Sequence, residues 1–310
     1  MNVRLLTILA VAVVALAAPW VVYPVFLMKA LCFALFACAF NLLLGYVGLM
    51  SFGHAMFFGM AAYFFGHTVK VWDWPVEFGI IVAVLGAALL GLVTGALAIR
   101  RQGIYFAMIT LAFAQMIYFL CVQMPFTGGE DGLQGIARKP LLFGLIPTEN
   151  DYGLYYVVLA IFLFGYGCIY RFIHSPFGQV LKAIRDNEQR AVSLGYEADR
   201  YKLLAFVLSA AVSGLAGATK AMVVHFATLT DVSSGTSGEV VLMALIGGLG
   251  TITGPVVGAF VVVAMQDYLA FVGQLVLVIQ GVIFVVIVLA FRKGVVGELS
   301  AWWKARRKIN

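Results

Sequence analysis

The sequence predicts an all-α protein, a polytopic bundle of transmembrane helices. Only 11% of its 310 residues are charged and its mean hydropathy is +1.03, so the chain has too little polar surface to coat a soluble globule. Apolar runs near the length of about 20 residues that spans a bilayer as helix recur along the whole chain. Helix is the expected structure because hydrocarbon offers backbone groups no partner and the runs lack the alternation of a membrane barrel.

We expect about ten spans, including helices broken by glycine. Their expected ranges are 5–27, 30–49, 51–69, 78–99, 104–122, 153–173, 201–224, 238–251, 255–272 and 275–291. A start in MNVR followed by an apolar run also fits a secretory signal, with Ala15 and Ala17 as a cleavage pattern. A retained first span is the preferred interpretation, because the run continues without a polar break.

The distribution of basic residues orients the spans. With both termini in the cytoplasm, most Lys and Arg residues fall on the cytoplasmic side, and only Lys29, Lys70, Arg138 and Lys139 fall clearly outside, as the positive-inside rule requires. Topology and attraction to membrane lipid therefore account for the net charge of +6 without a nucleic-acid partner.

The four cysteines are Cys32, Cys38, Cys121 and Cys168, and all lie in expected spans without a CxxC pair. We expect them to be small buried apolar residues.

A polar and glycine-rich interruption stands out in NLLLGYVGLMSFGHAMFFGMAAY, residues 41–63. Small residues such as Gly59 favour a tight helix crossing. Alternatively, the stretch is a discontinuous helix pair near the bilayer middle, whose free backbone groups meet the polar ends of a substrate. Asn41, Ser51 and His54 should face protein or a water-filled cavity in either case, which makes them pathway candidates; a histidine in this setting is more often a packing residue.

A second glycine-broken pair is expected around GGLGTITGPVVG, residues 247–258, which adds Gly248 and Thr251 to the pathway candidates. By the topology above it runs in the same sense as the first. In the span 104–122, Thr110 can bond its own preceding turn. Gln115 cannot satisfy both amide ends so easily and is the better cavity candidate.

The most charged segment is the expected cytoplasmic loop 174–202, HSPFGQVLKAIRDNEQRAVSLGYEADRYK. Ser175 can cap a helix whose first residue is Pro176, and apolar residues then repeat at helical spacing. A second helix is expected from about Asn187, ended or bent by Gly195. By default such a loop is a membrane-surface connector.

The pattern from Ala191 to Gly195 within this helix-turn-helix resembles the EAA loop by which ATP-binding-cassette (ABC) permeases dock their ATPases, although Gln189 and Arg190 depart from it. Four other stretches resemble signature segments of bacterial branched-chain amino-acid ABC permeases, of the LivM type rather than the LivH type. They are residues 41–63, RRQGIYFAMITLAFAQM at 100–116, TGGEDGLQGI at 127–136, and SGEVVLMALIGGLGTITGPVVGA at 237–259.

The resemblance covers nearly the whole chain and implies a single permease domain, 1–310, in the bacterial inner membrane. It implies half of a path for branched-chain amino acids, shared with a LivH-type permease, two cytoplasmic ATPases and a periplasmic binding protein. In loop 174–202 it assigns ATPase coupling to Pro176, Gly178, Arg185, Glu188, Ala191 and Gly195.

The chain itself carries no sign of catalysis. A P-loop needs a lysine after its glycines, and the glycine-rich stretch 247–258 has none. The histidines His54, His67, His174 and His225 show no metal-ligand spacing. We therefore expect a transport permease that is not an enzyme and binds no cofactor, with ATP used by partner subunits.

The expected outer loop, 123–152, is rich in turn residues and carries Glu130 and Asp131. It is a solvated connector by default and, as a hypothesis, the site that receives the binding protein.

Two alternatives stay open. The same ABC class also carries urea, short amides or other amino acids. An ion-coupled secondary transporter would need an ionisable residue deep in the membrane, whereas Lys220 and Asp267 lie near the outer ends of their expected spans, where interfacial placement costs little. A structural scaffold fits the polar and glycine interruptions poorly.

Overall fold

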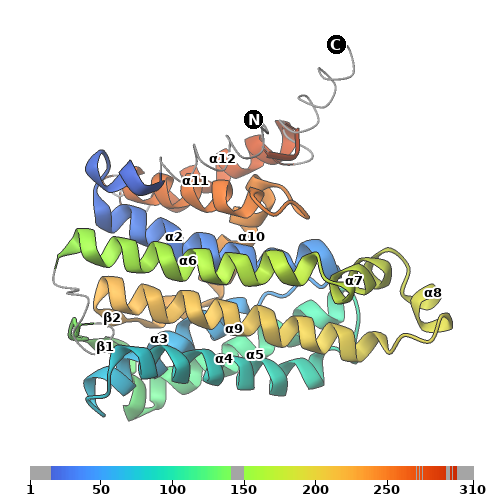
Figure 1. The fold of residues 1–310 in the computed structure, drawn as a ribbon, viewed down its shortest axis with the longest axis horizontal. Helices are drawn as coiled ribbons and strands as arrows, with labels where there is room; N and C mark the ends of the chain where they lie inside the picture. The colour runs from blue at the N-terminus through green and yellow to red at the C-terminus, as the bar shows by residue number, and fades with distance from the viewer. Residues whose placement is uncertain are drawn as a thin grey trace.

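The computed structural model is a bundle of roughly aligned helices, with the short helices α7 and α8 at one end and strands β1 and β2 at the other (Figure 1). The structure describes residues 15–140, 150–269 and 275–290, together with 271, 273, 294 and 296–298. The described helices are η1 (Ala18–Trp20), α2 (Pro24–Asn41), η2 (Leu42–Val47), α3 (His54–Lys70), α4 (Val76–Ala98), α5 (Ile104–Gln123), η3 (Pro125–Thr127), η4 (Gly129–Asp131), α6 (Asp151–Ile173), α7 (Pro176–Asp186), α8 (Glu188–Ser193), α9 (Ala198–Val224), η6 (Leu229–Asp231), α10 (Ser234–Gly247), α11 (Gly254–Leu269) and α12 (Leu275–Ala290).

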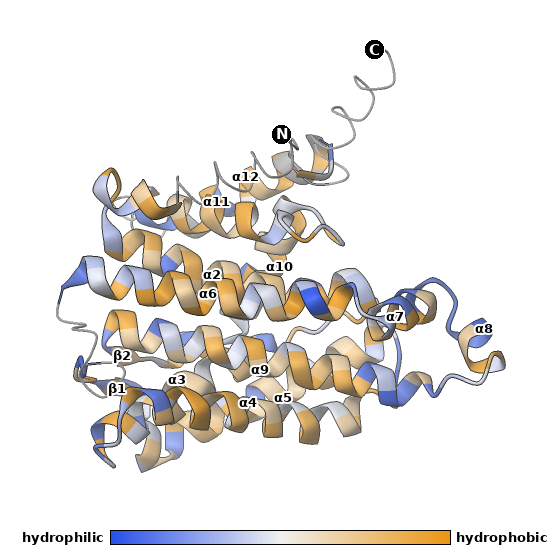
Figure 2. Ribbon diagram, viewed as in Figure 1, coloured by the Kyte–Doolittle hydropathy of each residue, from blue (hydrophilic) through white to orange (hydrophobic). Residues whose placement is uncertain are grey.

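The all-α membrane fold is confirmed. Within the described residues, five helices are long and apolar enough to cross a membrane, namely Pro24–Val47, Val76–Ala98, Ile104–Gln123, Asp151–Ile173 and Ala198–Val224, and α10 and α11 are shorter apolar helices. Hydrophobic residues cover the flanks of the bundle, while hydrophilic ones gather towards its two ends (Figure 2). This banded surface suits a bilayer.

The expected border between the first two spans is wrong. Helix α2 begins at Pro24 rather than near residue 30, after η1 and a turn. Tyr23 has extended ψ at 123°, because a proline ring disfavours helical geometry in the residue before it. Pro24 itself suits the first helical position, where no N–H is missed. Residues 1–14 of the expected first span lie outside the described residues.

Helix α2 is the most deeply enclosed of the long helices, with 94% of its most apolar window buried. Helices α3, α4 and α9 pack against one another through small residues. A Cβ at Gly217 of α9 would overlap the carbonyl oxygen of Phe58, and one at Gly59 of α3 would lie 2.7 Å from the backbone nitrogen of Val232. The expected tight helix crossing is therefore confirmed at α3.

Loop 123–152, expected on the outer side, is more ordered than a run of turns. Its strand β1 (Leu133–Gln134) pairs antiparallel with β2 (Phe226–Ala227), which follows α9. Gly132, with φ of 67°, precedes β1 at a position where a Cβ would overlap the carbonyl oxygen of Ala227. Residues 141–149 of this loop lie outside the described residues.

Three of the four cysteines, Cys32, Cys38 and Cys121, are buried as expected. The expectation is wrong for Cys168, which is exposed. It lies on α6, of which only 33% of the apolar window is buried, beside a shallow apolar hollow of about 570 Å³.

Candidate functional site

Helix α2 does not end cleanly but continues as the π-helix η2, which stops at Gly48 with φ of 81°. A non-helical segment then leads to the start of α3 at His54. Gly45 lies inside η2 where a Cβ would be 2.5 Å from Asn41 Oδ1 and 2.7 Å from the Gly250 nitrogen. We call the interruption between α2 and α3 the first break and the one between α10 and α11 the second break. The first break therefore has room only for glycine at position 45, where it touches the second break.

Asn41 joins the two breaks. Its Nδ2 donates to the Thr251 carbonyl oxygen at 2.8 Å, and the Gly250 N–H donates to its Oδ1 at 3.1 Å. Thr251 in turn donates from Oγ1 to the Gly248 oxygen at 2.7 Å. Asn41 is 2% exposed, so one buried amide is satisfied at both ends by the backbone of a segment about 210 residues away. Asn41, Gly248 and Thr251 thus form one cluster, as part of the expected pathway set.

Arg185 of α7 reaches the same place from the loop. Its Nη1 donates to the Gly45 carbonyl oxygen at 2.6 Å, and its Nη2 pairs with Asp186 at 2.9 Å. Its side-chain stem lies against Gly48, where a Cβ would be 2.9 Å from Arg185 Cγ. The charged loop is therefore in direct contact with the first break, which in turn contacts the second.

The start of α3 lies deep in the protein and its free N–H groups are capped by hydroxyls. Thr110 of α5 accepts from Phe52 N at 3.2 Å, Ser51 accepts from Gly53 N at 3.3 Å, and Ser237 of α10 accepts from Ala55 N at 3.0 Å. These bonds satisfy donors that a helix start leaves open. Ser51 and Ser237 are fully buried, so three elements converge on this helix end.

Thr110 and Gln115 of α5 differ from the sequence-based expectation that Gln115 is the more important polar residue of this helix. Thr110 does bond its preceding turn, donating to Ala107 O at 2.9 Å, but it also accepts from the first break. Gln115 lies half-buried further along α5 and is not among the groups that cap α3. The sequence could not reveal the role of Thr110, because Phe52 is far away in the chain.

His54 is fully buried in a packing role. Its Nε2 lies 2.8 Å from Ser209 Oγ, which donates its own hydrogen to Ala39 O at 2.6 Å. Nε2 must then carry the ring proton, and Nδ1 has no partner among the described residues. The edges of three phenylalanine rings surround the imidazole, those of Phe40, Phe57 and Phe206. The packing interpretation therefore fits His54 better than membership of the Asn41 cluster.

The helix-turn-helix expected in loop 174–202 is confirmed. Ser175 Oγ accepts from Gly178 N at 3.3 Å and Pro176 is the first residue of α7. Asn187 Oδ1 caps α8 by accepting from Arg190 N at 3.0 Å. Gly178 has no room for a Cβ, because one would overlap carbonyl oxygens at the end of α6. Helix α7 is thus held close to α6.

The loop is also held in place by an ion pair with α9 and by its own buried side chains. Glu188 pairs at 2.5 Å with Lys202 of α9, whose side chain is 3% exposed. Ala191 is buried against Ile184 and Ala198, so it stabilises the loop from inside and offers no surface to a partner. Gly195 ends α8 with φ of 90°.

The exposed surface of the loop, unlike Ala191, offers apolar side chains to a partner. Val192, Leu194 and Tyr196 are 54%, 70% and 40% exposed. A hollow of about 690 Å³ lies beside them, lined partly by Arg100, Glu188 and Arg200. Exposed apolar residues around a polar hollow are typical of a protein-docking surface.

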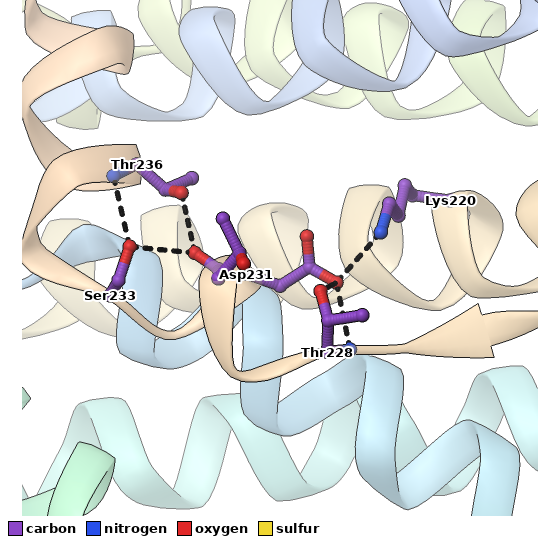
Figure 3. A network of polar contacts seen from close by, with 6 residues as sticks. Lys220, Thr228, Asp231, Ser233 and Thr236 are labelled. Carbon is purple, nitrogen blue, oxygen red and sulfur yellow. Dashed lines mark hydrogen bonds and ion pairs between the residues drawn. The ribbon is translucent and has the colours of Figure 1, made fainter. Parts of the chain in front are cut away.

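Near the other end of the bundle lies a buried ion pair (Figure 3). Lys220 Nζ is 2.7 Å from Asp231 Oδ2, and both side chains are 8% exposed. Asp231 also accepts from the backbone N–H of Thr228 at 3.3 Å. Lys220 lies about one turn before the end of α9 at Val224, near the end of its span as expected, but it is buried there in the ion pair with Asp231 of η6. Asp267 pairs with Lys29 at 2.8 Å.

Residues 22–289 match the family described as branched-chain amino acid transport system / permease component. The chain belongs to this permease family. It is 28% identical, in an alignment that covers 73% of the chain, to the high-affinity branched-chain amino acid transport system permease protein LivM of Escherichia coli, and equally to that of Salmonella typhimurium. A probable branched-chain amino acid transport permease protein LivM of Methanocaldococcus jannaschii is 25% identical over 44% of the chain and 41% of that protein.

The match spans 59% of the length of the Escherichia coli and Salmonella relatives. No solved structure matches the chain. In the described part of this permease, no three His, Cys, Asp or Glu side chains lie close enough together to hold a metal ion.

Proposed function

We propose that the chain is the permease subunit of an ABC importer and forms half of the membrane path for branched-chain amino acids. A LivH-type permease supplies the other half, a periplasmic binding protein delivers the cargo, and two cytoplasmic ATPases drive the cycle. The chain binds no cofactor, and ATP is used by the ATPases. Besides family membership, one observation carries the proposal: Arg185 of the charged loop is bonded to Gly45 in the first glycine break.

This contact gives the loop a way to move the path. Helix α7 is short, capped and packed on α6, so it moves as a rigid piece. A shift of α7 pulls on the Gly45 carbonyl through Arg185, and Asn41 passes the shift to the second break at Thr251. Both breaks then move together when an ATPase on the cytoplasmic side displaces α7.

The membrane orientation in this proposal has about ten spans and both termini in the cytoplasm of a bacterial cell, with the chain in the inner membrane. Loop 174–202 is the cytoplasmic coupling loop. The support for this orientation is the distribution of basic side chains. Arg100, Arg171 and Lys182 lie at the end of the bundle that carries the loop, whereas Lys70 and Lys139 lie at the end that carries β1. The positive-inside rule places the first group in the cytoplasm.

The cargo follows from the composition of the path and from the relatives' names. An apolar path suits aliphatic side chains, and a few polar groups must meet the charged ammonium and carboxylate ends. In such a system the binding protein supplies most of the selectivity. The same assembly could be built for urea, short amides or other amino acids, which the uptake assay below tests directly.

The ion-coupled transporter is less well supported. The buried Lys220–Asp231 pair is the feature that most favours it. However, each charge neutralises the other, and Thr228 bonds Asp231 in addition, so the pair is a satisfied structural contact that leaves no single charge to carry a coupling ion.

The test is to purify the tagged chain from its own membranes, identify its companions and reconstitute the assembly in vesicles. We expect a second permease and two ATP-binding chains to co-purify, and leucine, isoleucine or valine to accumulate only with ATP and loaded binding protein. Uphill uptake by the chain alone would contradict the proposal. Uptake of urea or amides in place of these amino acids would overturn only the cargo.

A further inference from the structure

The hollow of about 570 Å³ beside Cys168 lies along α6, near the end of the bundle that carries α7. It is called the α6–α9 hollow below, because Leu208 of α9 lines it together with residues of α6. Helices α6 and α9 lie side by side and lead towards the two short helices of loop 174–202 (Figure 1). The hollow therefore lies beside the junction between a membrane span and the charged loop.

The α6–α9 hollow is apolar along most of its length and cationic at one end. Leu163 and Phe164 line it and are 57% and 69% exposed. Arg171 lies about two turns further along α6, roughly 11 Å away, in the last turn of the helix. The described residues that line the hollow include no Asp or Glu. An occupant that fits them is hydrocarbon over this length and carries a negative charge at the α7 end.

Gly167 provides the room in the middle of the hollow. A Cβ at Gly167 would meet no atom within 4 Å, and its φ is not positive. Gly165, by contrast, is buried, and a Cβ there would be 2.8 Å from Leu35 Cδ1. Helix packing therefore explains Gly165 but not Gly167. Since glycine inside a helix is less stable than alanine, its presence at this open position indicates that something outside the described chain approaches α6 closely.

The charge of Arg171 is not neutralised within the described part of the chain. Its side chain is exposed, and no described residue gives its guanidinium a hydrogen bond or an ion pair. Two other arginines at this end differ, since Arg185 pairs with Asp186 and Arg200 pairs with Glu197. A basic side chain between membrane helices, at the level where a span ends, is a typical binding point for an anionic lipid headgroup.

The hollow beside the loop shows what a protein-docking surface looks like in the same molecule. That hollow, of about 690 Å³, is lined by charges of both signs, among them Arg100, Glu188 and Arg200. A partner protein offers both signs in return. The α6–α9 hollow instead combines one positive charge with hydrocarbon, which complements a phospholipid better than a protein surface.

We propose that the α6–α9 hollow binds an anionic phospholipid, with the phosphate on Arg171 and an acyl chain over Gly167. The inference goes beyond the proposed function, because it depends neither on the cargo nor on the side of the membrane that the loop faces. Phe172 also lines the hollow, and its ring centroid is 4.7 Å from that of Phe177 of α7. A bound lipid therefore stabilises the junction of α6 with α7.

The first test follows thermal unfolding of the full chain, purified in detergent with the chains that accompany it and stripped of lipid. Phosphatidylglycerol, zwitterionic phosphatidylcholine and glycerol phosphate, a headgroup without acyl chains, are each titrated. We expect phosphatidylglycerol to raise the midpoint at about fivefold lower concentration than phosphatidylcholine, as one contact between a basic side chain and an anionic headgroup predicts. Glycerol phosphate should have no effect. An equal response to both lipids, or a rise with glycerol phosphate alone, would overturn the inference.

The second test repeats the titrations on two variants. Arg171→Gln removes the charge and should abolish the preference for phosphatidylglycerol. Gly167→Leu fills the hollow and should raise the half-saturating concentration of phosphatidylglycerol at least about fivefold, while leucine, as the better helix former, keeps α6 folded. Arg101→Gln, at an exposed arginine of the same end, is the control for charge. Gly281→Leu, on α12 where a Cβ would also meet nothing, is the control for size. Both controls should respond as the unaltered chain does.

The outcomes separate a lipid site from its alternatives. A full preference for phosphatidylglycerol in Arg171→Gln, or an unchanged response in Gly167→Leu, would overturn the inference. Loss of an accompanying membrane chain from Gly167→Leu would assign the hollow to a subunit contact and would also overturn it. Because none of these measurements uses uptake, a failure of the proposed function is read separately from a failure of the lipid site.

Discussion

Asn41 shows how a single side chain can hold two distant backbone segments together. Its amide donates to Thr251 and accepts from Gly250, and Gly45 is beside it because any side chain there would collide with the same atoms. The sequence could predict that Asn41 faces protein, since an amide is costly in lipid. It could not predict the partner, because hydropathy patterns are local and this contact joins segments 210 residues apart.

Replacing Asn41 with leucine should destabilise the protein. The change keeps the branched shape of the side chain but leaves a buried N–H and a buried carbonyl without partners, at about 1–3 kcal/mol each. Thermal unfolding in detergent should show a lower midpoint than the unaltered chain. Thr94→Val is the matched control, because Thr94 only bonds its own helix at Leu90. Equal midpoints for the two variants would contradict the bridging role.

The Lys220–Asp231 pair makes a second prediction at this scale. Lys220→Met should lower the free energy of unfolding by about 3–5 kcal/mol, because it leaves a buried carboxylate uncompensated. Adding Asp231→Asn should recover part of that loss, since the amide is neutral and still bonds Thr228. The comparison is a double-mutant cycle by thermal unfolding. A double variant less stable than Lys220→Met would show that the pair is not coupled as described.

At the scale of elements, local chemistry predicts the loop and fails at the breaks. Ser175, Pro176 and Asn187 are capping residues with short-range partners, so the two loop helices could be predicted from a few residues each. The start of α2 at Pro24 followed the same kind of local rule but was hidden inside a continuous apolar run. The hydroxyl caps on α3 come from α5 and α10 and left no local signal.

The docking surface of the loop is a testable consequence of its packing. Leu194→Asp should reduce co-purification of the ATPase subunits several-fold, because Leu194, which directly follows α8, is 70% exposed. Val71→Asp, an exposed position at the opposite end of the bundle, should leave co-purification intact. Ala191 is unsuitable for this test, because a charge there would disturb the loop interior. Full retention by Leu194→Asp would place the docking surface elsewhere.

At the scale of the whole molecule, composition indicates a membrane protein, and the lack of barrel-type alternation in its apolar runs leaves a helical bundle. Which face of the bundle meets water is not visible in the sequence. Helices α2 and α10 are apolar almost all round, so the periodicity of their sequences does not show which side faces water. The candidate pathway could therefore be predicted as residue types and not as a surface.

The end of the molecule that we propose to face outward offers a prediction about delivery. Glu130 and Asp131 are exposed on the loop that pairs with β2. Reversing both charges should lower uptake that depends on the binding protein, while leaving assembly with the ATPases unchanged. The measurement is uptake at several binding-protein concentrations. Unchanged uptake at all of them would remove this loop from the delivery step.

Arg185 provides the most direct measurement of the central claim, that force enters through the loop and reaches the glycine breaks. Arg185→Ala in the reconstituted assembly should still bind the ATPases but lose at least about tenfold in amino acid moved per ATP hydrolysed, since a charged hydrogen bond contributes about 1.5–3 kcal/mol. Arg101→Ala, at an exposed arginine of the same end, should change this ratio little. A normal ratio in Arg185→Ala would contradict the account.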